Sequence, residues 1–277
     1  LLILADQKLE AWPVHLSLAG VYVRGNFLAV TSDRDQYRDH DYADFAQEFL
    51  QRNAAYRRDY ADTQDRIAWD PASAPAEEEG LAGRWGLSFP HAPDADPRAR
   101  PALWSPQAAP DVVVVETANL TSIPLPPGFE PLADHSDQNE HHLVAAKDTA
   151  RLRLCLRAAP PRCPDCLVIL RDRCAVVRLA AAARFERVTR GLRLGPDSAA
   201  SPSAYRRSRL VQLLSIHDAL DAGADQRDIA FGLVFPRHRP LIGATWKGSG
   251  ERRHTLRLIA DARRLVTGGY RKLLRHD

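Results

Sequence analysis

Hydrophobic and polar positions follow a helical period in the first part of the chain and then lose any period. In DYADFAQEFLQRNAAYRRDY, residues 41–60, apolar side chains recur at helical spacing, which predicts one or two amphipathic helices. Residues 71–110 are rich in proline, alanine and acidic side chains, with Trp85, Phe89 and Trp104 interspersed. Because no period persists there, we expect a segment that is mostly loop and is pinned by these aromatic rings.

Short β-branched or alternating runs follow in the middle of the chain. They are DVVVVE at 111–116, RLRLCLR at 151–157 and CLVILRDRCAVVRL at 166–179. Together they predict a small sheet around residues 111–180. The pattern then returns to a helix over residues 179–192, ended by Gly191 or Gly195, and GPDSAASPSA at 195–204 is typical of a linker.

The last third of the chain predicts three helices. Each begins at a side chain that can accept a backbone hydrogen bond, and glycine or proline ends the first two. The predicted boundaries are Ser201 with Pro202 and Gly223 for the first helix, Asp225 and Pro236 for the second, and Ser249 for the start of the third. Residues 235–248 exceed the usual turn, so we expect a helix-turn-helix variant with an insertion.

The predicted third helix has two different faces. At about 100° per residue, one face collects apolar side chains and the opposite face collects arginines. The apolar face holds Leu258, Ile259, Ala262, Leu265, Val266 and Leu273, and the basic face holds Arg253, Arg257, Arg264 and Arg271. Such a helix can pack on its neighbours while it presents guanidinium groups to phosphates and guanine edges. The plainer interpretation is an ordinary solvated helix face. The helix-turn-helix pattern that precedes this helix favours the DNA-contacting interpretation instead.

Charge is distributed unevenly, which the net charge of +3 conceals. From Ser201 onward there are 15 Lys and Arg against 7 Asp and Glu, whereas 23 and 28 precede that residue. A basic end attached to an acidic body is the electrostatic signature expected of a protein that binds a polyanion.

The cysteines offer a second hypothesis. Cys163 and Cys166 form a CxxC pair, and Cys155 and Cys174 each lie seven intervening residues away, which is compatible with a zinc knuckle or a redox site. A single CxxC is a weak signal, and we expect Cys155 and Cys174 to lie in strands as small buried groups. A zinc or redox protein centred on the CxxC pair therefore remains an alternative.

Other chemistry is not indicated by the sequence. His141 and His142 follow Glu140 in a polar stretch without the HExxH order, and we expect a solvated loop. No phosphate-binding glycine loop and no GxSxG motif occur, so we expect no enzyme activity, no cofactor and no metal. Apolar runs of about 18 residues are absent and the opening LLIL lacks the flanks of a signal peptide, so we expect a cytoplasmic protein without a membrane span.

Two groups of motifs resemble a known family of regulators. HDALDAGADQRDIAFGLV, Trp246 and RRLVTGGYRKLLR resemble the C-terminal DNA-binding domain of RovC-like bacterial regulators. ADFAQEFLQRNAAYRRDY, RWGLSFP and PALWSPQAAPDVVVVE resemble the proteobacterial transcriptional-regulator-like domain found with it. The resemblance covers Asp35 to His276, with Ala54 where proline is usual and Val266 and Thr267 where Leu-Met is usual.

The resemblance implies an activator of type VI secretion genes or of the excision and transfer of integrative elements. It also implies a homo-oligomer, with RNA polymerase as a candidate partner. The sequence as a whole predicts an α+β protein with a helical N-terminal module, a small β-containing middle and a C-terminal three-helix variant helix-turn-helix. The expected domains are 35–110, 111–200 and 201–277, after an unassigned lead segment at 1–34.

The expected function is sequence-selective binding of double-stranded DNA in transcription control. Lys247 and Arg264 are predicted to hold phosphates, Arg252, Arg253, His254 and Arg257 to reach bases, and Arg271 to complete the basic face. Residues 201–277 are expected to bind DNA on their own. A module that binds another protein through the same helix is the rival class, and base specificity from the loop around Arg237, Arg239 and Trp246 is the alternative within DNA binding.

Overall fold

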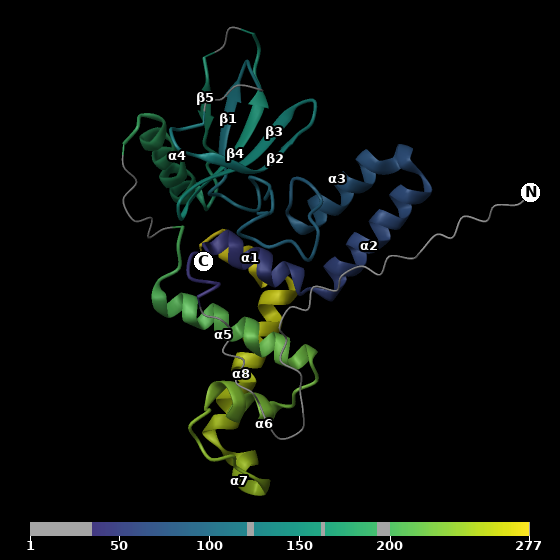
Figure 1. Ribbon diagram of the computed structural model, residues 1–277, viewed down its shortest axis with the longest axis vertical. Helices are drawn as coiled ribbons and strands as arrows, with labels where there is room; N and C mark the ends of the chain where they lie inside the picture. The colour runs from purple at the N-terminus through teal and green to yellow at the C-terminus, as the bar shows by residue number, and fades with distance from the viewer. Residues whose placement is uncertain (1–34, 121–124, 162–163, 193–199, 277) are drawn as a thin grey trace, which may run out of the picture.

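The computed structural model describes residues 35–120, 125–161, 164–192 and 200–276, and its parts follow one another along the long axis (Figure 1). A five-stranded sheet with helix α4 lies at one end, a helical layer lies in the middle, and a small helical unit forms the other end. The expected α+β class is confirmed. Within the described ranges, none of the helices combines the length and the apolar content needed to cross a bilayer.

The helical layer begins with two helices that are capped by side chains. Helix α1 (Tyr42–Gln51) starts at Asp41, whose carboxylate accepts a hydrogen bond of 2.9 Å from the amide of Asp44. Helix α2 (Ala54–Trp69) starts at Asn53, whose side chain accepts from two amides of the first turn. These caps satisfy amides that no helix carbonyl can reach. The prediction of one or two amphipathic helices is confirmed.

The expectation that residues 71–110 are mostly loop is wrong in its first part. A 3-10 turn, η1 (Pro71–Ser73), leads into helix α3 (Ala74–Trp85). The proline of the first turn is tolerated because its missing N–H would have no partner there, and alanine and glutamate favour helix. Gly86, with a φ of 81°, ends α3 in the left-handed conformation. The aromatic pinning holds in the irregular remainder, where Trp104 is only 2% exposed.

The sheet has the strand order β2-β3-β4-β1-β5. Its strands are β1 (Val113–Thr117), β2 (Glu130–Ser136), β3 (Glu140–Lys147), β4 (Ala150–Ala158) and β5 (Cys166–Val168). Strand β1 pairs with β4 in parallel, and the other pairings are antiparallel. The predicted small sheet is therefore confirmed, and β2 and β3 are two further strands that were not predicted.

Two local expectations for this region are wrong. His141 and His142 lie in β3 and not in a solvated loop, and His142 is only 2% exposed because alternate side chains of a strand point to opposite faces. Cys174 does not lie in a strand. It precedes helix α4 (Ala175–Thr189), where the run of alanines favours helix over the β-branched pair before it. Gly191, with a φ of 69°, follows α4 as predicted.

The C-terminal helices are α5 (Ala204–Asp221), α6 (Gln226–Ile229), α7 (Gly243–Gly248), α8 (Gly250–Arg264) and α9 (Tyr270–Leu274), with π-helical turns η2 (Ala230–Val234) and η3 (Leu265–Gly269). Three of these helices, α5, α6 and α8, begin at or near the predicted residues, whereas α7 and α9 were not predicted as separate helices. The cap of α5 is Ser203, two residues after the expected Ser201. Gly223 follows the end of α5 with a positive φ, and Asp225 and Ser249 cap α6 and α8, all as predicted. Cys163 and half of the predicted linker lie outside the described residues.

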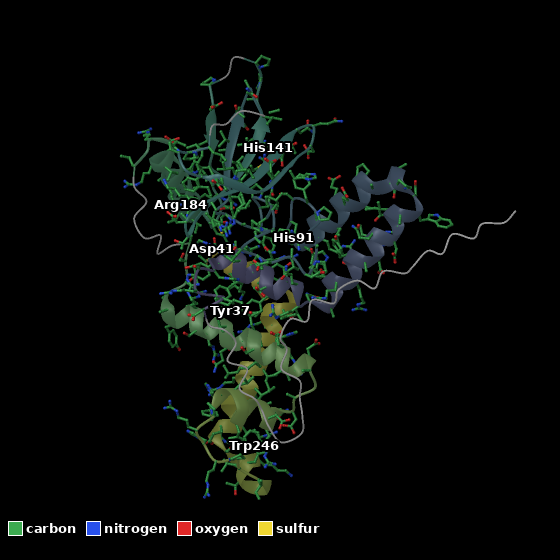
Figure 2. All side chains as sticks on the ribbon, in the orientation of Figure 1. Tyr37, Asp41, His91, His141, Arg184 and Trp246 are labelled. Atoms are coloured by element: carbon green, nitrogen blue, oxygen red, sulfur yellow. The ribbon has the colours of Figure 1, made fainter. Side chains whose placement is uncertain are left out.

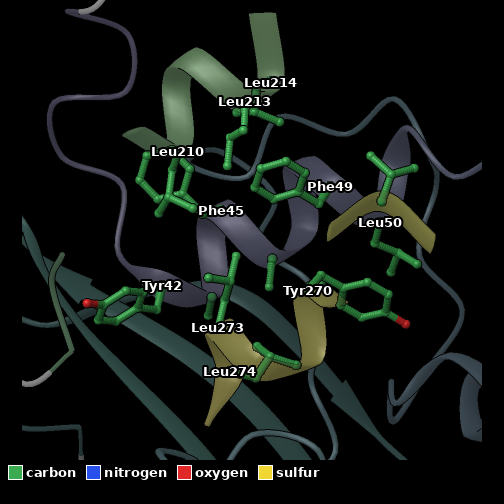
Figure 3. Close-up of a cluster of buried hydrophobic side chains, with 14 of the residues drawn as sticks. Tyr42, Phe45, Phe49, Leu50, Leu210, Leu213, Leu214, Tyr270, Leu273 and Leu274 are labelled. Atoms are coloured by element: carbon green, nitrogen blue, oxygen red, sulfur yellow. The ribbon is translucent and has the colours of Figure 1, made fainter. Parts of the chain in front are cut away.

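Helix α1 is at the centre of the largest hydrophobic core (Figure 3). Its Phe45 and Phe49 are fully buried, and it lies between α5 and α9. Leu213 of α5 and Leu273 of α9 belong to the same core. A fully buried side chain of this size contributes about 1.5–3 kcal/mol. The first and last parts of the described chain therefore share one core.

A buried ionic cluster ties α1 to the sheet. The Arg153 guanidinium of β4 lies 2.8 Å from the carboxylate of Asp41, 3.4 Å from that of Asp111 and 3.6 Å from that of Asp44. Burial opposes ionisation of Asp41, but the charge and hydrogen bonds of Arg153 outweigh it and lower this pKa to about 2. Burial and the adjacent Asp41 carboxylate raise the pKa of Asp44 to about 6. The three buried carboxylates therefore depend on the Arg153 guanidinium to balance their charge.

Candidate DNA interface

Three helices build the unit at the end remote from the sheet. Helix α8 packs against α5 and α6 through Leu258, Ile259 and Ala262, all of which are buried. Ile229 of α6 is fully buried in the same core. This packing leaves the beginning of α8, together with α7, at the protruding tip of the molecule (Figure 1).

The two-faced pattern predicted for the third helix is confirmed along α8. The apolar face is buried as described, whereas Arg253, Arg257 and Arg264 are exposed. Arg253 and Arg257 are one turn apart, and Arg264 follows roughly 10 Å beyond Arg257 at about 1.5 Å per residue. The exposed face of α8 therefore presents a row of guanidinium groups.

The third helix is not continuous, contrary to the prediction. Helix α8 ends at Arg264, and the chain bends in η3 at Gly268, whose φ is 140°. A Cβ atom on the next residue, Gly269, would lie 2.7 Å from the carbonyl oxygen of Arg264. Glycine is required at both positions, for its backbone freedom at one and its lack of a side chain at the other. Helix α9 starts after this bend, so Arg271 does not extend the basic row of α8.

The residues after the bend attach the C-terminal helix to the helical layer. Tyr270 is fully buried, and its Oη donates a hydrogen bond of 2.9 Å to the carbonyl of Trp85 at the end of α3. The Arg271 guanidinium donates to the carbonyl of Arg84 and lies 5.5 Å from the centre of the Tyr270 ring. The GGYR motif thus joins the C-terminal helix to the end of α3, and Arg271 lies at this junction and not at the tip.

The predicted insertion, residues 235–248, folds against the start of α8. Trp246 of α7, labelled in Figure 2, contacts Phe231 with ring centres 5.5 Å apart. Phe235 contacts His254 of α8 with ring centres 5.7 Å apart. The insertion and the first turns of α8 therefore form one surface.

This surface carries a concentration of cations that we call the basic tip. Its members are Arg237, Arg239, Lys247, Arg252, Arg253 and Arg257. Between residues 235 and 257 the sequence holds one acidic residue, Glu251, whose carboxylate lies 3.3 Å from His238. None of the six cations forms an ion pair with a described residue, whereas many arginines of the body do. Unneutralised charge of this kind attracts a polyanion.

The structure brings together most of the predicted contact residues. Lys247, Arg252, Arg253, His254 and Arg257 gather at the tip, with His254 half-buried under Phe235. Arg264 stands apart, because it pairs at 2.8 Å with Asp261, which also binds Arg209 of α5 at 3.1 Å. Arg237 and Arg239, assigned by the sequence only to an alternative site, belong to the same surface. The scarcity of acidic residues in the insertion was the signal for them.

A helical unit whose exposed helix face and insertion are dominated by positive charge has the features of a nucleic-acid-binding domain. Comparison with protein families agrees. Residues 167–275 match the RovC DNA-binding family, described as "T6SS, Transcription factor, DNA binding domain", and residues 30–90 match the proteobacterial transcriptional regulator-like domain. The chain thus matches both domain families and is a transcription factor with a DNA-binding domain. The C-terminal match begins in β5 and includes α4. The search of curated proteins finds no match.

Proposed function

We propose that this transcription factor binds double-stranded DNA sequence-selectively through its basic tip, and that it activates secretion or mobile-element genes. One observation carries the DNA-contact part: six cations without ion-pair partners gather at a protruding end of the described structure. The regulated genes and the activating sign are supported by the description of the matched family and by the resemblance to RovC-like regulators. The chain then acts by binding and not by catalysis.

The beginning of α8 is the part that enters the major groove. A groove about 12 Å wide accepts one helix, and recognition helices usually place their first turns at the base edges. Arg253 and Arg257 project from those turns on the exposed face. Arg offers two parallel donors that match guanine, so these two side chains read bases, with Arg252 and His254 beside them.

The insertion and the far end of α8 hold the DNA backbone. Arg237, Arg239 and Lys247 flank the start of α8 and bind phosphates on either side of the groove. Arg264 lies further along the helix and shares its charge with Asp261. A straight helix in a curved groove cannot keep all its arginines at base edges, so Arg264 contacts phosphate. Assembly into a homo-oligomer, with RNA polymerase as a candidate partner, completes the proposal.

Binding of the full chain to duplex DNA tests this assignment. Duplexes are first selected from genomic fragments, and affinity is then measured by fluorescence anisotropy at several salt concentrations. The tip variant changes Arg237, Arg239 and Lys247 to Ala, and the matched control changes Arg58, an exposed arginine of α2 without an ion pair among the described residues. Each lost phosphate contact lowers the salt slope by about 0.9, so the tip variant should lose roughly three units and the control none.

The opposite result is equally clear. A tip variant that melts like the wild type and keeps both its affinity and its salt slope would place the DNA contacts elsewhere. A tip variant that loses binding to a protein partner but keeps its DNA affinity would favour the rival class, an interaction module.

A further inference from the structure

Three side chains of the sheet converge at one point. They belong to strands β3 and β4 and not to the C-terminal helices that form the basic tip. His142 of β3 and Cys155 of β4 are register partners, and side chains of directly opposed residues in antiparallel strands share a face. Glu140 lies two residues before His142 and so points to that same face. His142 and Cys155 are buried, and Glu140 is half-buried at the edge of the cluster.

The distances among the three polar atoms are those of a metal-binding cluster. Cys155 Sγ lies 3.6 Å from His142 Nε2 and 3.7 Å from Glu140 Oε2, and Nε2 lies 2.8 Å from Oε2. Zinc bonds of about 2.3 Å to sulfur and about 2.0–2.2 Å to nitrogen and oxygen give ligand separations of roughly 3.4–3.6 Å in a tetrahedron. Two of the three separations agree, and the third is shortened by a hydrogen bond that a cation would replace.

A nucleophilic triad does not explain this arrangement. In such a triad the acid orients one imidazole nitrogen while the other nitrogen faces the nucleophile. Here the Glu140 carboxylate and the Cys155 thiol both face Nε2 of His142. Three different ligand types aimed at one another around a common point suit a cation better than a proton relay.

We propose that Glu140, His142 and Cys155 form a binding site for a zinc-class divalent cation, with water as the fourth ligand. One sulfur, one imidazole nitrogen and one carboxylate oxygen are the donors that zinc prefers. Burial lowers the pKa of His142, which favours the neutral imidazole that a metal requires. Burial and the Glu140 carboxylate raise the pKa of the Cys155 thiol to about 12, so cation binding displaces the thiol proton to solvent.

Neighbouring groups already orient the ligands. Arg157 donates from Nε to Oε1 of Glu140 at 2.8 Å, which leaves Oε2 directed at the cluster. The Phe89 ring lies edge-on to the His142 ring, with centres 5.3 Å apart. Outer groups that hold a ligand in place typically account for 10–100-fold in metal affinity.

Cobalt binding to the full chain tests the site. Co²⁺ ligated by a thiolate produces a sulfur-to-metal charge-transfer band, and the titration end point gives the stoichiometry. We expect this band in the wild type and in the control Cys174→Ala, whose thiol lies outside the cluster. Cys155→Ala should lose the band, and Arg157→Met should weaken cobalt binding by about 10–100-fold while its thiol remains. Zinc should compete the band away in the wild type.

Several outcomes would overturn the site. These are a wild type with no band, a band that persists in Cys155→Ala, and a band that depends on Cys163 and Cys166 instead. Because Cys155 is fully buried, Glu140→Gln serves as the second variant if Cys155→Ala unfolds, and undiminished cobalt affinity in it would count against the proposal. DNA affinity, measured alongside, should stay unchanged in all these variants, which separates this site from the proposed function.

Discussion

Replacement of Arg153 by methionine tests the buried ionic cluster that joins α1 to the sheet. Methionine keeps much of the volume of arginine but removes the charge. The guanidinium is only 3% exposed and lies within 4 Å of the carboxylates of Asp41, Asp44 and Asp111. The variant therefore leaves three buried carboxylates without their shared partner.

The expected loss in the free energy of unfolding follows from the burial of these carboxylates. Breaking a buried ion pair by removing one partner costs about 3–5 kcal/mol, and a folded domain has only about 5–15 kcal/mol in total. The matched control is Arg190→Met, which breaks an exposed pair with Glu186 whose arginine is 73% exposed. Exposed pairs contribute about 0–1 kcal/mol. Urea denaturation at pH 7 should therefore separate the two variants by several kcal/mol.

The same experiment at lower pH checks the electrostatic cause. In the wild type the pKa of Asp41 is about 2, below its unfolded value, so its contribution is present at neutral pH and is lost only as the pH falls toward 2. Without Arg153, the burial of Asp41 and Asp44 is no longer opposed by its charge, and the folded pKa values of these two carboxylates rise above the unfolded ones. Protonation of these carboxylates then stabilises the variant as the pH falls from about 7 to about 5. The difference in the free energy of unfolding between the variant and the wild type therefore becomes smaller. Two results would refute the reasoning. One is a loss of unfolding free energy in Arg153→Met no larger than that in Arg190→Met, and the other is a difference between Arg153→Met and the wild type that stays the same at both pH values.

Three other predictions concern the C-terminal part. Gly269→Ala should lower the free energy of unfolding by about 1–3 kcal/mol because its Cβ meets a backbone carbonyl, and thermal unfolding measures this against Gly80→Ala, where the added Cβ meets nothing. Arg257→Ala should cost about 1–3 kcal/mol on a selected duplex and less on a scrambled one, whereas Arg264→Ala should weaken both alike; equal losses for Arg257→Ala would limit it to phosphate contact. Residues 201–277 alone should show less cooperative unfolding and weaker DNA binding than the full chain, since they lack α1; equal stability would contradict the shared core.

Most helices of the first and last thirds could be predicted because their signals are local, whereas α3 and α7 lie in segments that were predicted as loop. Asp225 and Ser249 cap helices as their sequence positions indicate, and the apolar face of α8 follows the helical period. The bend at Gly268 could not be read from that period, because the apolar face continues through it to Leu273. Only the contacts of Tyr270 with α3 explain why the chain turns there.

The sheet was harder to predict because its strands depend on distant partners. Strand β3 begins with polar residues, and His142 is buried only through its contacts with β4 and Phe89. The convergence of His142 with Cys155 is a matter of strand register, which no spacing along the chain reveals. The basic tip was easier, since Lys247, Arg253 and Arg257 lie close together in the sequence as well as in space.

Photo-crosslinking from single positions tests most directly whether the basic tip contacts DNA. A photoreactive amino acid replaces exposed Thr245 of α7 in one variant and exposed Asp62 of α2 in the other, and each is irradiated with a selected duplex. The account predicts a strong crosslink from position 245, which salt and unlabelled duplex suppress, and none from position 62. A crosslink from position 62 with none from position 245, in variants of equal DNA affinity, would contradict it.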